Sequence, residues 1–134
     1  MLNQEEIKAV NSTLDAIIRS ATNKELSDDI IAEALDELEG DYIAFMHENT
    51  LSWLSEIKVL TDHQVMLIKG LREKIDKIPP FLWNVESYRN SKEWSETRKI
   101  AENILSSLGI VKRQVDDELI DVERIQARNN PNRI

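Results

Sequence analysis

The sequence contains no cysteine, and only three glycines and three prolines occur among its 134 residues. Without cysteine the chain has no disulfide framework, no thiolate metal site and no cysteine nucleophile. The few glycines and prolines leave little material for the many tight turns of a sheet protein, so a helical class is favoured. The length fits one domain with one core. Because nothing in the sequence requires an oxidising compartment, we expect a cytoplasmic location.

Basic residues are absent from residues 25–57, which hold ten acidic residues. Residues 1–24 are balanced, and residues 58–134 hold twelve acids and fourteen bases, so the net charge of −8 originates in this one stretch. Phosphate backbones and anionic lipid surfaces both attract positively charged proteins, so we expect neither nucleic acid nor a membrane as the direct partner. No apolar run approaches the roughly 18 residues of a membrane span, and the acidic N-terminus does not resemble a targeting leader.

The spacing of the apolar residues predicts four helices. They recur three and four positions apart, which predicts helices over about 4–21, 28–39, 41–78 and 92–128. Gly40 is expected to end the second helix. Pro79 and Pro80 end the third and open an elbow at residues 79–91.

The two later helices carry heptad-like stripes of the kind found in coiled coils, and short connections make neighbouring helices antiparallel. The predicted fold is therefore all-α, a single helical domain over residues 1–134. It is an elongated bundle of two long antiparallel heptad-patterned helices and two shorter N-terminal helices.

A capping signal lies inside the third predicted helix. Thr61 and Gln64 have the spacing of a capping box, so this helix is either continuous or broken at Thr61. With an antiparallel partner across the elbow, facing residues should have numbers that sum to about 170. Thr61 would then lie level with Gly109, which suggests a common bend.

The sequence offers few groups for catalysis. His47 and His63 are the only imidazoles, and on one helix they would point in different directions. Acidic groups with the spacing of magnesium-binding helices occur in two places, but the pattern is weak in a chain with 25 acids: they are Glu33 with Asp36 and Glu37, and Glu118 with Asp121. We therefore expect no catalytic residue, no metal and no cofactor.

Two groups of residues could bind a partner protein. Aromatic side chains cluster around the elbow, either as an interface or as core that closes the end of the bundle, and the core interpretation is favoured: they are Phe81, Trp83, Tyr88 and Trp94. The second predicted helix, with the residue that follows Gly40, carries an acidic face composed of Asp28, Asp29, Glu33, Asp36, Glu37, Glu39 and Asp41.

The predicted helix lengths also suggest self-association. The first two helices would cover only about half of a long helix pair, and would leave an apolar surface around Leu71 and Leu105 exposed. A second copy related by a two-fold axis would cover it, and a heterologous partner is the alternative.

Three functions are compatible with these features. The first is a non-catalytic interaction module, an adaptor or small assembly subunit. The second is an acidic inhibitor or immunity-type protein that covers a basic nucleic-acid-binding surface on its target. The third, with the weakest support, is a magnesium-dependent helical nucleotide hydrolase.

Overall fold

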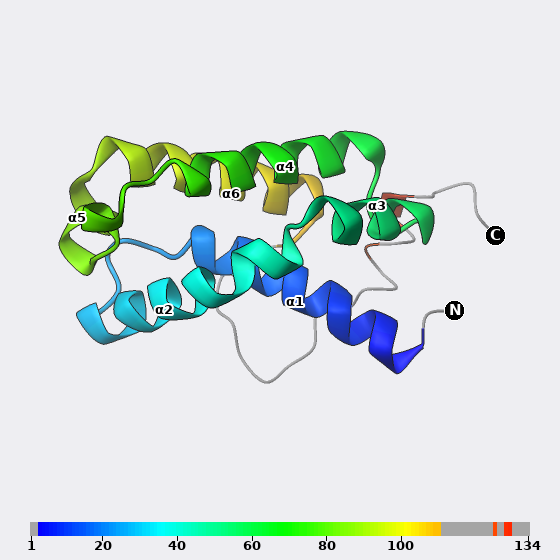
Figure 1. The fold of residues 1–134 in the computed structure, drawn as a ribbon, viewed down its shortest axis with the longest axis horizontal. Coiled ribbons are helices and arrows are strands. Elements are labelled where there is room, and N and C mark those ends of the chain that lie inside the picture. Colours follow the sequence, from blue (N-terminus) through cyan, green and yellow to red (C-terminus); the bar gives the residue numbers. More distant parts are fainter. Residues whose placement is uncertain (1–2, 111–124, 126–127, 130–134) are drawn as a thin grey trace.

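A computed structural model describes residues 3–110, 125, 128 and 129, and all regular secondary structure within them is helical (Figure 1). In chain order the elements are α1 Gln4–Ser20, α2 Asp28–Phe45, α3 Glu48–Glu56, α4 Asp62–Asp76, the 3-10 turn η1 Pro80–Leu82, α5 Val85–Asn90 and α6 Lys92–Ser107. The predicted all-α class is confirmed. No helix in these described ranges is long and apolar enough to cross a lipid bilayer.

The prediction that Gly40 ends the second helix is wrong, because α2 continues to Phe45. A glycine inside a helix costs about 1 kcal/mol relative to alanine. This cost is outweighed because the added turn brings Tyr42 against the core and leads directly to the buried Met46. The actual end is set further on, where the carbonyl of Phe45 accepts a hydrogen bond from the buried hydroxyl of Thr13 at 2.9 Å.

The long helix predicted over residues 41–78 does not form. It is interrupted after α2 and again between α3 and α4, where Lys58 has a φ of 65°. This second turn places Val59 and Leu60 in the core, with 0% and 3% of their surface exposed. Thr61 then starts α4 with the capping box, in which Thr61 and Gln64 exchange two hydrogen bonds of 3.1 Å. Of the two alternatives left by the sequence, the broken helix is correct.

The helix predicted over residues 92–128 also ends early. After Ser107, Gly109 adopts a φ of 72°, and the amides of Gly109 and Ile110 donate to the carbonyls of Ser106 and Leu105. This is the Schellman arrangement that commonly ends helices. Glu118 and Asp121, the second predicted carboxylate pair, lie outside the described residues.

The helices form two layers, with α4 and α6 in one and α1 and α2 in the other (Figure 1). In the first layer α4 and α6 run antiparallel: Lys74 forms an ion pair with Glu96, and the Gln64 amide donates to the Ser107 hydroxyl at 3.0 Å. Facing residues here have numbers that add up to about 170. In the second layer α1 packs against α2, and it also contacts α6, so α1 connects the two layers.

This arrangement removes the reason for expecting a homodimer. Leu71 and Leu105 are both 0% exposed within the single chain. The prediction of an uncovered apolar half was wrong because it assumed two continuous long helices, whereas the break before Thr61 lets α1, α4 and α6 enclose one core. No apolar surface remains at these two leucines for a second copy to cover.

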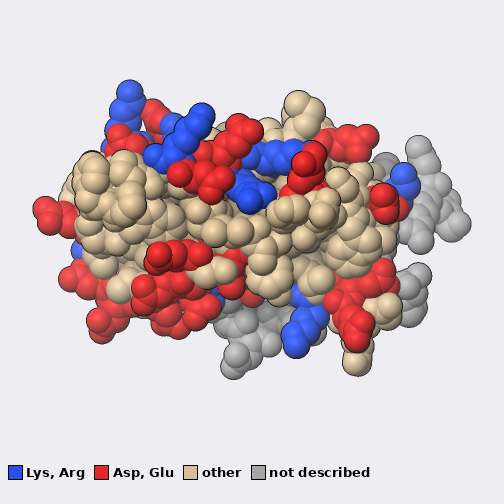
Figure 2. Space-filling model, viewed as in Figure 1, with Lys and Arg blue, Asp and Glu red and all other residues tan. Residues whose placement is uncertain are grey.

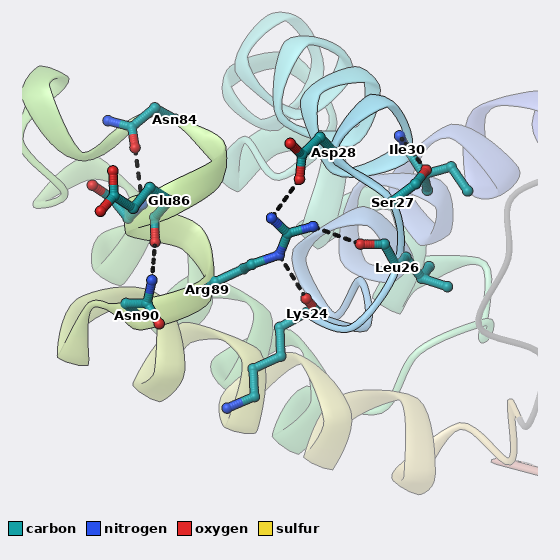
Figure 3. A network of polar contacts seen from close by, with 10 residues as sticks. Lys24, Leu26, Ser27, Asp28, Ile30, Asn84, Glu86, Arg89 and Asn90 are labelled. Atoms are coloured by element: carbon teal, nitrogen blue, oxygen red, sulfur yellow. Dashed lines mark hydrogen bonds and ion pairs between the residues drawn. The ribbon is translucent and has the colours of Figure 1, made fainter.

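Helix α5 attaches the elbow to the end of α1 and to the loop before α2. The buried Tyr88 hydroxyl donates to the carbonyls of Thr22 and Ser20, at 2.7 and 3.2 Å. Beside it, the Arg89 guanidinium binds the loop that precedes α2, donating to the carbonyls of Lys24 and Leu26 and to the Asp28 carboxylate (Figure 3). One side chain therefore holds two carbonyls of this loop and the first residue of α2.

Replacing Gly40 by alanine tests the continuity of α2. Nothing lies within 4 Å of the position of the added Cβ, so Gly40→Ala should raise the free energy of unfolding by about 0.5–1 kcal/mol. The matched control is Gly109→Ala, which should lower it by roughly 1–2 kcal/mol, because Gly109 has a positive φ and the Arg128 side chain lies 3.2 Å from the new Cβ. Urea unfolding followed by circular dichroism measures both. A loss of stability in Gly40→Ala would mean that α2 ends there.

Removal of the Tyr88 hydroxyl tests the attachment of α5. Tyr88→Phe leaves two carbonyls without this donor in a buried position, so we expect a loss of about 1–3 kcal/mol in the free energy of unfolding. Tyr42→Phe is the control, since Tyr42 is only half-buried, and it should have a smaller effect. Equal effects of the two variants in urea unfolding would contradict the role assigned to Tyr88.

The same hydroxyl predicts a loss of stability in alkali. Burial raises the pKa of Tyr88 to about 12, from about 10 for an exposed tyrosine. Since the folded pKa is the higher one, the stability due to the neutral hydroxyl is complete below pH of about 10 and is lost as the pH rises through about 12. In a Tyr42→Phe background, where Tyr88 is the only tyrosine, the stability advantage over a further Tyr88→Phe change should shrink across this range. An advantage independent of pH would contradict this.

Candidate functional site

The acidic face predicted from the sequence lies on the outer surface of α2. Its residues are exposed except for Asp41, which is half-buried: Asp28, Asp29, Glu33, Asp36, Glu37, Glu39 and Asp41. Figure 2 shows carboxylates gathered over α2 at the lower left, whereas the surface over α4 mixes both signs of charge. Seven of the ten acidic residues of the stretch 25–57 thus gather on α2.

Most of these carboxylates have no counter-charge within the described part of the chain. Asp28 is bound by Arg89, and the rise that burial and Glu37 cause in the pKa of Asp41 is partly offset by the positive charge of Arg19. Five carboxylates form no ion pair with any described residue: Asp29, Glu33, Asp36, Glu37 and Glu39. The acidic face is therefore open to a positively charged partner.

The crowding of like charges is unfavourable for the folded chain. The pKa of Asp41 is raised above its ordinary value, first by burial and then by the neighbouring charge of Glu37. Asp29 with Glu33, and Glu33 with Glu37, are also four positions apart, and each such like-charged pair costs an isolated helix about 0.2–0.5 kcal/mol. Apart from Asp28 and Asp29, which lie in the first turn at the positive end of the helix dipole, the acidic face therefore does not serve the stability of α2.

Next to the acidic face, an aromatic groove of about 340 Å³ opens between α2 and the end of α4. We use this name for the surface formed by Glu39, Tyr42, Ile43, Ile75, Asp76, Ile78, Pro80 and Trp83. Its walls are aromatic and aliphatic, and one carboxylate from each helix, Glu39 and Asp76, belongs to its rim.

The aromatic rings of the groove are held in place by specific contacts. Trp83 stacks on Tyr42 with ring centroids 6.1 Å apart and packs edge-on against Trp94 at 5.1 Å. Its indole nitrogen donates to the carbonyl of Ile78 at 3.3 Å. The pKa of the Tyr42 hydroxyl is raised, first by burial and then by its interaction with the Asp76 carboxylate.

The four aromatic residues predicted at the elbow divide into two groups. Tyr88 and Trp94 are 1% and 0% exposed and belong to the core, with the Trp94 indole donating to the carbonyl of Leu82 at 2.7 Å. Trp83 is half-buried in the groove wall, and Phe81 is 75% exposed beside it in η1. The core interpretation therefore holds for the first pair, and the second pair lies at the surface.

The groove itself could not be anticipated from the sequence. Its residues come from α2, the end of α4 and the elbow, which meet only in the folded chain. The available signal was Ile43, a large apolar residue on α2 that is 54% exposed.

The residues considered for metal chemistry are not brought together. No group of three or more His, Asp or Glu side chains in the described ranges could hold a metal ion. The Nδ1 atom of His47 accepts a hydrogen bond from the Asn49 amide and caps α3, and His63 lies exposed in the first turn of α4. The magnesium hypothesis gains no support from Glu33, Asp36 and Glu37.

A second cleft, of about 610 Å³, lies between the end of α1 and α6, and its lining includes Lys24, Arg98 and Lys99. Arg98 is already engaged, because it donates to the carbonyl of Tyr88 and lies 4.8 Å from the centre of that ring. Glu102 adds an opposing charge to the same wall. The acidic face and the aromatic groove have the more distinctive chemistry.

No protein-family model, curated protein or solved structure matches this chain. Any functional assignment therefore rests on the shape and charge of the described residues.

Proposed function

We propose that this chain is a non-catalytic protein-interaction module that binds a basic surface of a partner protein through the acidic face of α2. The observation that carries the proposal is the set of five exposed carboxylates on one helix that form no ion pair with any described residue. A cytoplasmic setting fits a chain without cysteine.

The energetics of the acidic face support an intermolecular role. Repulsion among carboxylates such as Glu33 and Glu37 is a cost in the free chain. A basic partner would convert that repulsion into attraction across an interface, and the long range of the interaction would accelerate the encounter. Because exposed charges are screened by salt, the rate of association should fall as ionic strength rises.

The acidic inhibitor or immunity-type protein is a more specific form of this proposal. In that case the basic surface would be one with which the target binds nucleic acid, and α2 would compete with phosphate groups for the same lysine and arginine side chains. The concentration of acidic residues in residues 25–57 favours this form over a general adaptor. A heterologous partner is favoured over a second copy, because Leu71 and Leu105 are buried.

Two variants with the same change in net charge test the proposal. The first neutralises the acidic face at four positions, by Asp29→Asn, Glu33→Gln, Asp36→Asn and Glu37→Gln. The control neutralises four exposed acids on other elements, by Glu5→Gln, Glu56→Gln, Glu73→Gln and Glu86→Gln. Both variants should fold, because none of these positions is buried.

Wild-type protein and both variants would be used to capture partners from cells of the source organism, with quantification by mass spectrometry. A partner that wild type and control retain should be reduced at least about tenfold with the first variant, and its association rate should fall steeply with salt. A partner bound equally by all three proteins would show that the acidic face is not the binding surface.

A further inference from the structure

We infer that the aromatic groove receives an arginine side chain of the basic partner, with an aliphatic neighbour of that arginine packing on the surface beside it. This inference rests on the proposed function and adds the chemistry of the contact. The groove shares Glu39 with the five unpaired carboxylates of α2, but it also needs residues of α4 and of the elbow.

The groove offers an apolar base and flat aromatic walls. Ile75 and Ile78, which are 1% and 5% exposed, form its apolar base, while Tyr42 and Trp83 are half-buried in its walls. A guanidinium group stacks on such rings, and its aliphatic stem packs against apolar surface. An anionic side chain has no comparable interaction with these walls.

The charge of the rim favours a cation. Glu39 is exposed and forms no ion pair with any described residue. Among the described residues Asp76 has one ion-pair partner, Arg72, at a long distance of 3.9 Å, and it also interacts with the Tyr42 hydroxyl. Arg72 brings a positive charge to this site. Because it lies 3.9 Å from Asp76, the carboxylate oxygens of Asp76 can still accept hydrogen bonds from a second guanidinium. Arginine fits better than lysine, because its planar fork can stack and donate to carboxylates at the same time.

The groove continues directly from the acidic face. Asp36, Glu39 and Ile43 follow one another at spacings of three and four along α2, so they lie on the same side of the helix. Next to the groove, Ile43 is 54% and Phe81 75% exposed, which provides apolar surface for a residue beside the arginine. One basic segment lying along α2 could therefore reach both surfaces (Figure 2).

A defined peptide tests the inference without knowledge of the natural partner. The probe is acetyl-Gly-Arg-Leu-Arg-Gly-amide, titrated into isotope-labelled full-length protein, with lysine and glutamate versions of the same peptide for comparison. The chain has three tryptophans, so the indole signal of Trp83 can be assigned by the single change Trp83→Phe. We expect the arginine peptide to shift this signal and the amides of Tyr42 and Ile43 with saturation, the lysine peptide to bind several-fold more weakly, and the glutamate peptide not to bind.

Variants at the rim identify the source of the affinity. Glu39→Gln and Asp76→Asn should each weaken binding of the arginine peptide by about fivefold, and Phe81→Ala, at a 75% exposed residue, should weaken it without affecting the fold. Glu73→Gln is the matched control, because Glu73 is exposed on α4 but does not line the groove, and it should leave the affinity unchanged.

Several outcomes would overturn the inference. Shifts confined to residues 28–37 would leave the acidic face as a binding surface but exclude the groove. A Trp83 signal that changes on dilution of the free protein would identify a second copy of the chain as the occupant. Absence of any binding by the arginine peptide would refute the inference alone, since the proposed function is decided separately by partner capture with the neutralised variants.

Discussion

The turn between α3 and α4 is the constraint on which the rest of the fold depends. Burial of Val59 and Leu60 requires the chain to leave the helix, and Lys58 accepts an unfavourable positive φ so that both side chains reach the core. The buried polar groups at this turn are satisfied by a small network. Asn129 donates to the carbonyl of Val59 and to the side chain of Gln64, both at 2.7 Å. The Gln64 side chain also accepts a hydrogen bond from the amide of Thr61, the N-cap of α4, and donates to the Ser107 hydroxyl, so the start of α4 and the end of α6 are held at one level.

Several features of this fold were predictable because they depend on neighbouring residues alone. Ser27, Thr61 and Ser91 each cap a helix through their own side chains, as the local sequence indicates. The failures have a tertiary origin. At Gly40 the intrinsic cost of glycine in a helix is smaller than the gain from packing Tyr42 against the core. In residues 41–78 the apolar residues keep the helical spacing even across the turn before Thr61, because the residues of that turn are themselves buried in the core. The spacing of apolar residues shows which residues are buried, and a buried turn can have the same spacing as a helix.

Of the candidate site, only the acidic face could be predicted from the sequence. A run of acids without bases becomes an acidic face on any exposed helix, whichever way the helix is packed. The groove is different, because Tyr42 and Trp83 are far apart in the sequence and meet only when the elbow folds back against α2. An exposed ion pair such as Lys69 with Glu48 contributes only about 0–1 kcal/mol to the stability of the fold. The five carboxylates of the acidic face that form no ion pair with a described residue can therefore be neutralised without loss of an ion pair that supports the fold.

The attachment of the elbow explains how the groove is preformed. Trp83 is held against Trp94, whose own indole is fixed by the carbonyl of Leu82, and Tyr88 anchors the same segment to the end of α1. A side chain that is already ordered loses little conformational freedom when a ligand binds, which lowers the entropic cost of association. Charge on α2 acts over a distance of about a Debye length, roughly 8 Å in physiological salt, whereas stacking in the groove requires contact. The two surfaces would thus act at different stages of binding, the acidic face on the rate of encounter and the rigid groove on the lifetime of the complex.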